Sequence, residues 1–334
     1  MTAPLTSPLP PSAPARSPSA VVPETPTAQA PAHVQVPAGV PVSVPGPVAG
    51  ADAGRDEPVK LWLCPNDGLP PAVAGLLAAH WLDAQEQRTA SRFLFERDRR
   101  QYLLAHTLVR RALALEAGLA EAELVIWRSA RGRPFLRPAA GELPRGGAQL
   151  DFNLSHAGGY SLLGIVRRHR IGVDVERLED RDERAITTIV RTFAAPEREW
   201  VERAAPGPDR DRRALRVWTL KEAYSKARGI GLGLPFDAFV FTLDDERGVR
   251  AFTPPADDTA RPWRFVELEP VPGVLAAVAV PADAAQDPVL HLGYGFPGAA
   301  RNSAASRCPG RWAAGRPRPS CEHRDHLQQA SKTS

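Results

Sequence analysis

The chain has 334 residues, 43% hydrophobic and 24% charged, with a formal net charge of +4, a length that allows one large domain or two of ordinary size. Residues 301–334 hold seven basic and two acidic residues, so the rest of the chain sums to −1. That distribution argues against nucleic acid as a specific partner of the folded part.

Both ends of the chain have compositions that are typical of disorder. Residues 1–57 contain no Phe, Trp or Tyr, and 13 of the 35 prolines fall within the first 50 positions. A segment with so little apolar surface to bury cannot offset its ordering entropy. We therefore predict a disordered, Pro/Ala-rich segment over 1–57 and a disordered basic tail over 298–334. The folded part then consists of an N-terminal half, 58–168, and a C-terminal half, 169–297.

The sequence also bears on localisation. The run 25–51 carries no Lys, Arg, Asp or Glu, but its six prolines exclude a membrane helix. No cationic start followed by an apolar core marks a secretory signal. The three cysteines are an odd number, and two of them lie in the tail, so a disulfide framework is not expected. We predict a cytoplasmic protein without a membrane anchor.

Strands and helices alternate along the predicted folded part. The apolar patterns predict strands at 59–63, 124–128 and 150–154, and a helical stretch over 85–117 that breaks near Arg97. Residues 160–168 and 170–178 are interpreted as a hairpin. Helices are predicted at 182–193, 196–204 and 209–228, and strands at 238–243, 263–268 and 273–280. The recurrence predicts two similar α+β halves with a site between them.

Two acids stand in the apolar run "IGVDVE", residues 171–176. In a strand alternate side chains share a face, so Asp174 and Glu176 point the same way. Two like charges on one face are unfavourable unless a cation neutralises them, one acid is protonated, or the strand lies at a solvated edge. The pattern alone leaves these three explanations open.

The predicted helix 209–228 carries a second polar cluster. Its Trp218, Glu222 and Lys226 are spaced by four and share one helical face, while Lys221 lies in the adjacent row. An alternative interpretation is a buried Trp beside an exposed Glu and Lys pair. The glycines of "GIGLGLP" close this helix, whereas a dinucleotide fingerprint needs glycines that open one.

The stretch "FNLSHAGGY", residues 152–160, ends a predicted strand with polar side chains. Ser155 and His156 are adjacent and face opposite ways, and the pattern G-x-S-x-G is missing, which argues against a serine hydrolase. Polar donors beside Gly158 and Gly159 are better suited to an anion, above all a phosphate.

The motifs "FNLSHAGG", "IGVDVE" and "WTLKEAYSKARGIGLGLPFDAF", in this order, resemble those of the Sfp-type 4'-phosphopantetheinyl transferases. The resemblance covers residues 58–290. It implies the α+β fold of that family, a pseudo-twofold pair of similar halves with the active site between them, in a monomer. It also implies transfer of 4'-phosphopantetheine from coenzyme A to a serine of an apo acyl, polyketide or peptidyl carrier protein, with release of adenosine 3',5'-bisphosphate.

The resemblance further implies roles for residues of this sequence. Mg²⁺, with Mn²⁺ as a possible substitute, would be held by Asp174, Glu176 and Glu222. Lys226 would contact the pyrophosphate and share catalysis with Asp174 and Glu222, with Lys221 beside it. Coenzyme A phosphates would be bound by Ser155, His156 and Arg133.

One position departs from the family pattern. Where the family often has an arginine for the nucleotide's 3'-phosphate, this chain has Gln101, so Arg99 or Arg100 is expected to take over that contact. Arg110 is expected at the helix surface. The alternative function is a non-catalytic protein that binds coenzyme A or a nucleotide, for which the three acids would be superfluous.

Overall fold

The structure is a computed structural model that describes residues 58–120, 123–138, 149–180, 182–245, 248–259, 261–282, 289–298, 306–307 and 313–315. The predicted disordered segment 1–57 lies outside the described residues, as does most of the predicted basic tail. No helix within the described ranges is both long enough and apolar enough to span a bilayer.

The chain alternates strands and helices as the sequence patterns predict. The first half contains β1 (Val59–Pro65), α1 (Pro71–Trp81), α2 (Ala84–Ala90), α3 (Glu96–Ala117), β2 (Leu124–Arg128), β3 (Pro134–Pro138), β4 (Leu150–Ala157) and β5 (Tyr160–Arg167). The second half contains β6 (Gly172–Arg177), α4 (Glu183–Val190), α5 (Ala195–Glu202), α6 (Pro208–Arg228), β7 (Val240–Leu243), β8 (Val249–Thr253), β9 (Trp263–Val271) and β10 (Val274–Pro281). The break in the predicted helix 85–117 is confirmed between α2 and α3. Helix α1 and strands β3 and β8 were not predicted.

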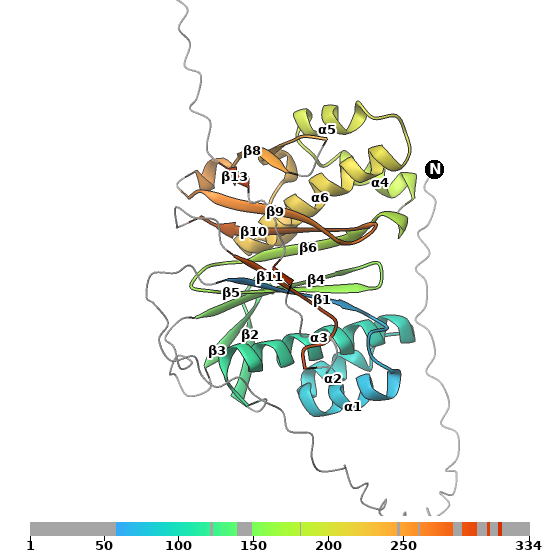
Figure 1. Cartoon of the computed structure of the whole chain (residues 1–334), viewed down its shortest axis with the longest axis vertical. Coiled ribbons are helices and arrows are strands. Elements are labelled where there is room, and N and C mark those ends of the chain that lie inside the picture. The colour runs from blue at the N-terminus through green and yellow to red at the C-terminus, as the bar shows by residue number, and fades with distance from the viewer. Residues whose placement is uncertain are drawn as a thin grey trace, which may run out of the picture. The chain divides into compact units, whose positions relative to one another are not determined.

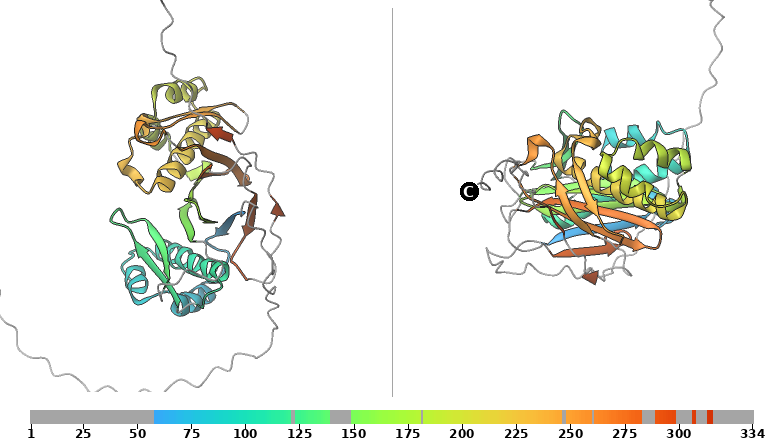
Figure 2. Two further views of the ribbon diagram at one scale, coloured as in Figure 1. Left: turned by 90° about the vertical axis from the view of Figure 1, so that its left-hand side faces the viewer. Right: turned by 90° about the horizontal axis from the view of Figure 1, so that it is seen from above.

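Two sheets lie face to face between two layers of helices (Figures 1 and 2). One sheet has the order β12-β11-β1-β5-β4 and the other the order β13-β9-β10-β6. Helix α3 covers the first sheet and helix α6 the second (Figure 1). Each half thus places one long helix on an antiparallel core of strands, which confirms the predicted α+β class.

Three apolar clusters hold these layers together. Leu104, Leu108 and Phe152 belong to the cluster between α3 and the first sheet. Tyr224 and Phe265 belong to the cluster between α6 and the second sheet. The third cluster lies between the sheets and is rich in β-branched residues, with Val173 and Val175 of β6 among them. Since β6 turns these valines toward the opposite sheet, its alternate residues Asp174 and Glu176 face α6.

The predicted hairpin between 160–168 and 170–178 is wrong. Strand β5 pairs with β4 and β1, whereas β6 pairs with β10 in the other sheet. The hairpin is formed by β4 and β5, with Ala157 opposite Tyr160, and its two turn residues Gly158 and Gly159 have φ values of 54° and 81°. A tight two-residue turn favours such positive φ angles, which glycine adopts without strain.

The chain beyond β10 returns to both sheets. Strand β11 (Leu290–Tyr294) pairs in parallel with β1, so the end of the predicted C-terminal half joins the sheet of the N-terminal half. Within the predicted disordered tail, β12 (Ser306–Arg307) pairs with β11 and β13 (Ala313–Gly315) pairs with β9. These pairings were not predicted. Edge strands present unpaired backbone groups, so a segment without an apolar pattern can still pair with them through its backbone.

Arg110 was expected at the helix surface, but it is buried. Its guanidinium donates to Glu86 Oε2 and to Asp83 Oδ2, each at 2.7 Å. Asp83 and Glu86 also form the capping box of α2. Arg110 therefore joins α3 to the start of α2. Arginine is usually exposed, and the sequence pattern could not show this exception because both partners of Arg110 lie more than twenty residues away along the chain.

Candidate active site

Strands β4 and β6 are edge strands of different sheets, and side chains of β4 bridge them. Asp151 Oδ2 accepts the backbone N–H of Ile171 at 2.8 Å, and Asn153 Oδ1 accepts the backbone N–H of Val173 at 2.8 Å. One step further along the same face of β4, Ser155 Oγ donates to Asp174 Oδ1 at 2.8 Å. This row of alternate residues fixes β6, and with it Asp174, against the N-terminal half.

Helix α6 crosses the other side of β6 at very short range. A Cβ atom added to Gly172 would lie 1.9 Å from the carbonyl oxygen of Ala223 and 2.5 Å from the backbone nitrogen of Ala227. Only a glycine allows the strand and the helix to approach this closely. The approach brings the acids of β6 within reach of the polar face of α6.

The predicted face of α6 meets the predicted face of β6. Trp218 Nε1 donates to Glu176 Oε1 at 3.0 Å. Lys226 Nζ donates to Asp174 Oδ1 at 2.6 Å and to Ser155 Oγ at 3.0 Å, and lies 3.9 Å from Glu222 Oε2. The structure therefore brings these side chains from β4, β6 and α6 together. Asp174 and Glu176 are 3% and 6% exposed, which argues against the solvated-edge explanation.

The electrostatics of this cluster favour a shared cation. Burial, with the nearby Asp174 and Glu176, raises the pKa of Glu222 to about 7, although Lys226 acts in the opposite sense. Burial alone would lower the pKa of Lys226, but Asp174, Glu222 and Glu176 raise it above its ordinary value. The site thus holds three carboxyl groups and one ammonium, and the excess negative charge is unfavourable in a buried position.

The donor chemistry of the site fits a hard divalent cation such as Mg²⁺, which prefers carboxylate oxygens. Asp174 Oδ2 is buried and has no hydrogen-bond partner within the described part of the chain. As the side chains stand, however, no group of three or more His, Cys, Asp or Glu among the described residues is arranged to hold a metal ion. In this arrangement the ammonium of Lys226 occupies the position against Asp174 Oδ1.

His156 lies on the opposite face of β4 from Ser155, as the sequence predicts. Its Nδ1 is 2.6 Å from Gln101 Nε2 on α3. Desolvation of the ring and the nearby Lys226 ammonium lower the pKa of His156. Gln101 also lines a cavity of about 730 Å³, together with Asn66, Arg97, Arg100 and Gly159.

Of the two arginines that were expected to take over the phosphate contact, one lines this cavity. Arg100 lines it and donates to the carbonyl of Leu69 at 2.7 Å, while its Nε is buried without a hydrogen-bond partner among the described residues. Arg99 forms an exposed ion pair with Glu96 at 3.2 Å. Arg100 is therefore the arginine that is available beside Gln101.

The expected coenzyme role of Lys221 is wrong. Its side chain is 0% exposed, and Nζ donates to the carbonyls of Phe236 and Phe239 at 2.6 and 2.7 Å. Glu197 Oε2 lies 2.8 Å away and completes the ion pair. All three N–H donors are satisfied inside the protein, so none remains for a substrate. The four-residue spacing of the polar face could not reveal this, because Lys221 lies one row away from it.

Arg133 is bound to several protein groups and also lines a cavity. Its guanidinium donates to Asp151 Oδ2 at 2.5 Å, to the carbonyl of Ile171 at 2.8 Å, and to the carbonyl of Lys226. These bonds leave Arg133 Nε buried without a hydrogen-bond partner among the described residues, so the role of Arg133 as a clamp on a phosphate stays a prediction. The β2–β3 hairpin uses Arg133 to hold the C-terminus of α6 against β4 and β6.

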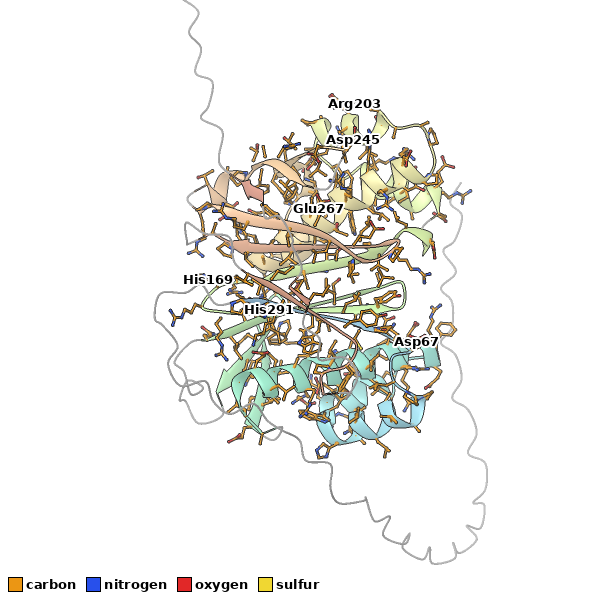
Figure 3. All side chains as sticks on the ribbon, viewed as in Figure 1. Asp67, His169, Arg203, Asp245, Glu267 and His291 are labelled. Carbon is orange, nitrogen blue, oxygen red and sulfur yellow. The ribbon has the colours of Figure 1, made fainter. Side chains whose placement is uncertain are left out.

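A second, cationic cavity adjoins Arg133. It has a volume of about 450 Å³ and is lined in part by Arg168, His169, Arg170 and Arg261. His169 from this cavity and Asp67 from the larger one lie on opposite sides of the molecule as viewed in Figure 3. The two cavities are therefore separate features.

Sequence reasoning missed three polar residues that organise the site: Asn66, Asp151 and Asn153. The alternation of Asp151, Asn153 and Ser155 in a strand was a usable signal, since it puts three polar side chains on one face of β4. Asn66 follows β1 and reaches Gln101 Oε1 at 3.0 Å, a contact between distant segments that no local pattern indicates.

Two family models match consecutive parts of the chain. Residues 170–279 match the 4'-phosphopantetheinyl transferase superfamily, and residues 70–166 match the N-terminal part of 4'-phosphopantetheinyl transferase. The boundary between the matches falls in the loop between β5 and β6. The residues that form the site come from both matched segments.

Several named proteins are similar to this chain. A phosphopantetheinyl transferase of Thraustochytrium sp. is 33% identical over 199 residues, which cover 56% of this chain and 67% of that protein. A 4'-phosphopantetheinyl transferase of Nostoc sp. is 29% identical over 223 residues, 66% of this chain and 87% of that protein. The 4'-phosphopantetheinyl transferase of Bacillus subtilis is 28% identical over 166 residues, 49% and 68% of the two chains. With the two matched halves meeting at the Asp174 cluster, the chain belongs to the 4'-phosphopantetheinyl transferase superfamily.

Proposed function

We propose that the Asp174 cluster transfers 4'-phosphopantetheine from coenzyme A to a serine of an apo carrier protein and releases adenosine 3',5'-bisphosphate. The observation that carries this proposal is the meeting of Lys226, Asp174 and Glu222 at the seam of the two halves. The site therefore offers both an ammonium, from Lys226, and carboxylates, from Asp174 and Glu222, to a pyrophosphate and its cation. The non-catalytic alternative is not favoured, because the similar proteins are named as transferases.

We further propose that Mg²⁺, or Mn²⁺ in its place, is held by Asp174, Glu176 and Glu222. Their oxygens supply the hard ligands that these ions prefer, and Asp174 Oδ2 is available for such a bond. When bound, the ion would neutralise charge on the pyrophosphate. Lys226 would then turn its ammonium from Asp174 toward the same pyrophosphate.

The residues of the cluster divide the reaction between them. The serine Oγ attacks the β-phosphorus, and the bond from that phosphorus to the bridging oxygen breaks, so that the electron pair leaves with adenosine 3',5'-bisphosphate. Lys226 stabilises the charge that develops on the bridging oxygen. Glu222 accepts the serine proton directly or through a water.

Ser155 and His156 complete the coenzyme site. Ser155 lies between Lys226 Nζ and Asp174 Oδ1, so its hydroxyl is placed to meet a phosphate oxygen that approaches the ammonium. His156 and Arg100 lie near the cavity that Gln101 lines, which we propose takes the nucleotide end. We propose a cytoplasmic monomer, with coenzyme A and a carrier domain as its partners.

The experiment that tests the function is intact-mass spectrometry. Several apo carriers of the fatty-acid, polyketide and nonribosomal-peptide types are incubated with coenzyme A, Mg²⁺ and the full chain. The expected result is a mass increase of one phosphopantetheine group on at least one carrier, which is lost when the carrier serine is replaced by Ala. A coenzyme A affinity that is unchanged in EDTA, without mass increase on any carrier, would favour the non-catalytic alternative.

A further inference from the structure

A chain of four polar side chains leads from β5 to His156. Ser161 Oγ donates to Asn66 Oδ1 at 3.4 Å, and Asn66 Nδ2 donates to Gln101 Oε1 at 3.0 Å. Gln101 Nε2 then lies 2.6 Å from His156 Nδ1. The four residues come from β5, the segment after β1, helix α3 and the end of β4, so the chain ties these elements together beside the 730 Å³ cavity.

The direction of these hydrogen bonds sets the protonation of the ring. A carboxamide has one oxygen that accepts and one NH₂ group that donates. Because Gln101 Oε1 is used by Asn66, its NH₂ group faces His156. With the Gln101 carboxamide in this orientation, Nδ1 carries a lone pair, and the single proton of a neutral imidazole resides on Nε2.

The charges around His156 agree with a neutral ring. Desolvation, the Lys226 ammonium and His106 lower the pKa of His156, while a hydrogen bond with its own backbone and the Asp174 carboxylate act in the opposite sense. The cavity beside Gln101 carries charges of both signs, from Arg97, Arg100, Asp67, Glu96 and Asp98. Protonation would place an Nδ1–H against the NH₂ group of Gln101, two donors in contact, which is unfavourable.

We infer that Gln101 is a positioning residue that holds His156 as the neutral tautomer with its proton on Nε2. The Nε2–H group is then the ring's hydrogen-bond donor for an anionic group of the substrate. The identity of that group as a phosphate of coenzyme A rests on the proposed function. Recognition at this point therefore uses a neutral donor of fixed direction in place of a cation.

The direct test is NMR of the full chain labelled with ¹⁵N in histidine. Two-bond correlations between ring nitrogens and ring protons distinguish a protonated from an unprotonated nitrogen. The sequence contains eight histidines, so His156 is assigned from the signals missing in His156→Gln. We expect Nδ1 of His156 to be unprotonated and Nε2 to be protonated near neutral pH. A proton on Nδ1 in the wild type would overturn the inference.

Two substitutions at Gln101 extend this test. Gln101→Glu replaces the donor by an acceptor, so the proton of His156 should move to Nδ1 and the pKa of His156 should rise by about one unit or more. Gln101→Leu removes the contact and should give a mixture of tautomers. The matched control is Gln85→Glu, the same change at an exposed position of α2, which should leave the His156 signals unchanged. A Gln101→Glu spectrum identical to the wild type would also overturn the inference.

Kinetics connect the tautomer to the reaction. Gln101→Leu should raise KM for coenzyme A roughly tenfold, the loss expected for one hydrogen bond to a charged group, and should leave kcat within about twofold. A fall in kcat at constant KM would contradict a role in substrate binding. Failure of the wild type to modify any carrier would instead overturn the proposed function, while the spectra test the tautomer independently.

Discussion

Asn153 on β4 accepts the backbone N–H of Val173 on β6 at 2.8 Å, and this bond joins the edges of two different sheets. Both residues are buried. The bond replaces, with a side chain, the ladder partner that Val173 would have in a continuous sheet. Because Asp174 follows Val173 directly, the position of the acid depends on this contact between the halves.

Replacement of Asn153 by Ala should therefore destabilise the protein. The N–H of Val173 would remain buried without a partner, which costs about 1–3 kcal/mol. Urea unfolding at neutral pH measures the change, with Gln85→Ala on an exposed helix surface as the control. An unfolding midpoint equal to that of the wild type would show that the bridge contributes nothing to the union of the halves.

Gly172→Ala should have an effect of at least similar size from a single methyl group. The added Cβ would lie 1.9 Å from the carbonyl oxygen of Ala223, which is backbone and cannot rotate away. Strand β6 would have to move from α6, at a cost of about 1–3 kcal/mol or more, and Asp174 would separate from Lys226.

The matched control for this glycine is Gly75→Ala in α1, where an added Cβ meets nothing within 4 Å. That change should be neutral or stabilise the helix by about 0.5–1 kcal/mol. Thermal unfolding and transfer assays on both variants separate the two cases. Wild-type stability in Gly172→Ala would contradict the close approach of strand and helix.

Much of the active-site cluster follows from local periodicity. The period of two put Asp174 and Glu176 on one face, and the spacing of four put Trp218, Glu222 and Lys226 on one face. Both faces are confirmed by the contacts between β6 and α6. Periodicity is sufficient here because each element presents its polar face as a continuous row.

Periodicity could not predict which strands pair or which distant side chains meet. Strands β5 and β6 are both apolar and adjacent in the chain, so pattern alone favoured a hairpin, while the turn at Gly158 and Gly159 was the better signal. The buried ion pairs of Lys221 and Arg133 were missed for a related reason. Their partners Glu197 and Asp151 lie 24 and 18 residues away, and only the fold shows that they meet.

Lys221→Met should destabilise the protein strongly. The change would leave Glu197 buried without its cation and the carbonyls of Phe236 and Phe239 without their donor, and breaking such a pair costs about 3–5 kcal/mol. Lys60→Met is the control, since the Lys60–Glu116 pair is partly exposed and should cost less than about 1 kcal/mol. Equal losses in the two variants, measured by urea unfolding, would contradict a special role for burial at Lys221.

The pKa of Glu222 predicts a pH dependence of stability in EDTA. Its folded-state pKa is raised from 4.5 to about 7, so the folded protein retains a proton that the unfolded chain loses in this interval. The stabilising contribution is full below pH 4.5 and is lost as the pH rises through 7. Glu222→Gln removes this titration, so between pH 5 and 8.5 the variant should gain up to about 3 kcal/mol relative to the wild type.

Glu86→Gln provides a control of opposite sign. Burial alone would raise the pKa of Glu86, but hydrogen bonds from His106 and Arg110 lower it. The carboxylate therefore stabilises the fold above its unfolded-state pKa of 4.5, so the stability lost in Glu86→Gln should be nearly the same at pH 5 and at pH 8.5. Urea unfolding at both pH values measures the differences, and parallel profiles for the two variants would contradict the assignment at Glu222.

The last prediction concerns catalysis at the three acids. As the bond to the leaving group breaks, charge builds on the bridging oxygen, and Lys226 with a cation held by Asp174, Glu176 and Glu222 would stabilise it. Asp174→Ala and Glu222→Gln should each lower turnover by about a hundredfold or more, the scale of a lost electrostatic contact in a transition state. The affinity for coenzyme A should fall less, because the proposed nucleotide end lies at the Gln101 cavity.

Transfer assays on the wild type and both variants over a Mg²⁺ titration measure this effect. Asp245→Ala is the matched control, since Asp245 pairs with Arg213 in the helical layer of the C-terminal half, where Figure 3 labels it. That variant should retain the wild-type rate and the wild-type Mg²⁺ dependence. Full activity without a divalent ion, or normal turnover in Asp174→Ala, would mean that the paired acids only balance Lys226, as they do when no ion is bound.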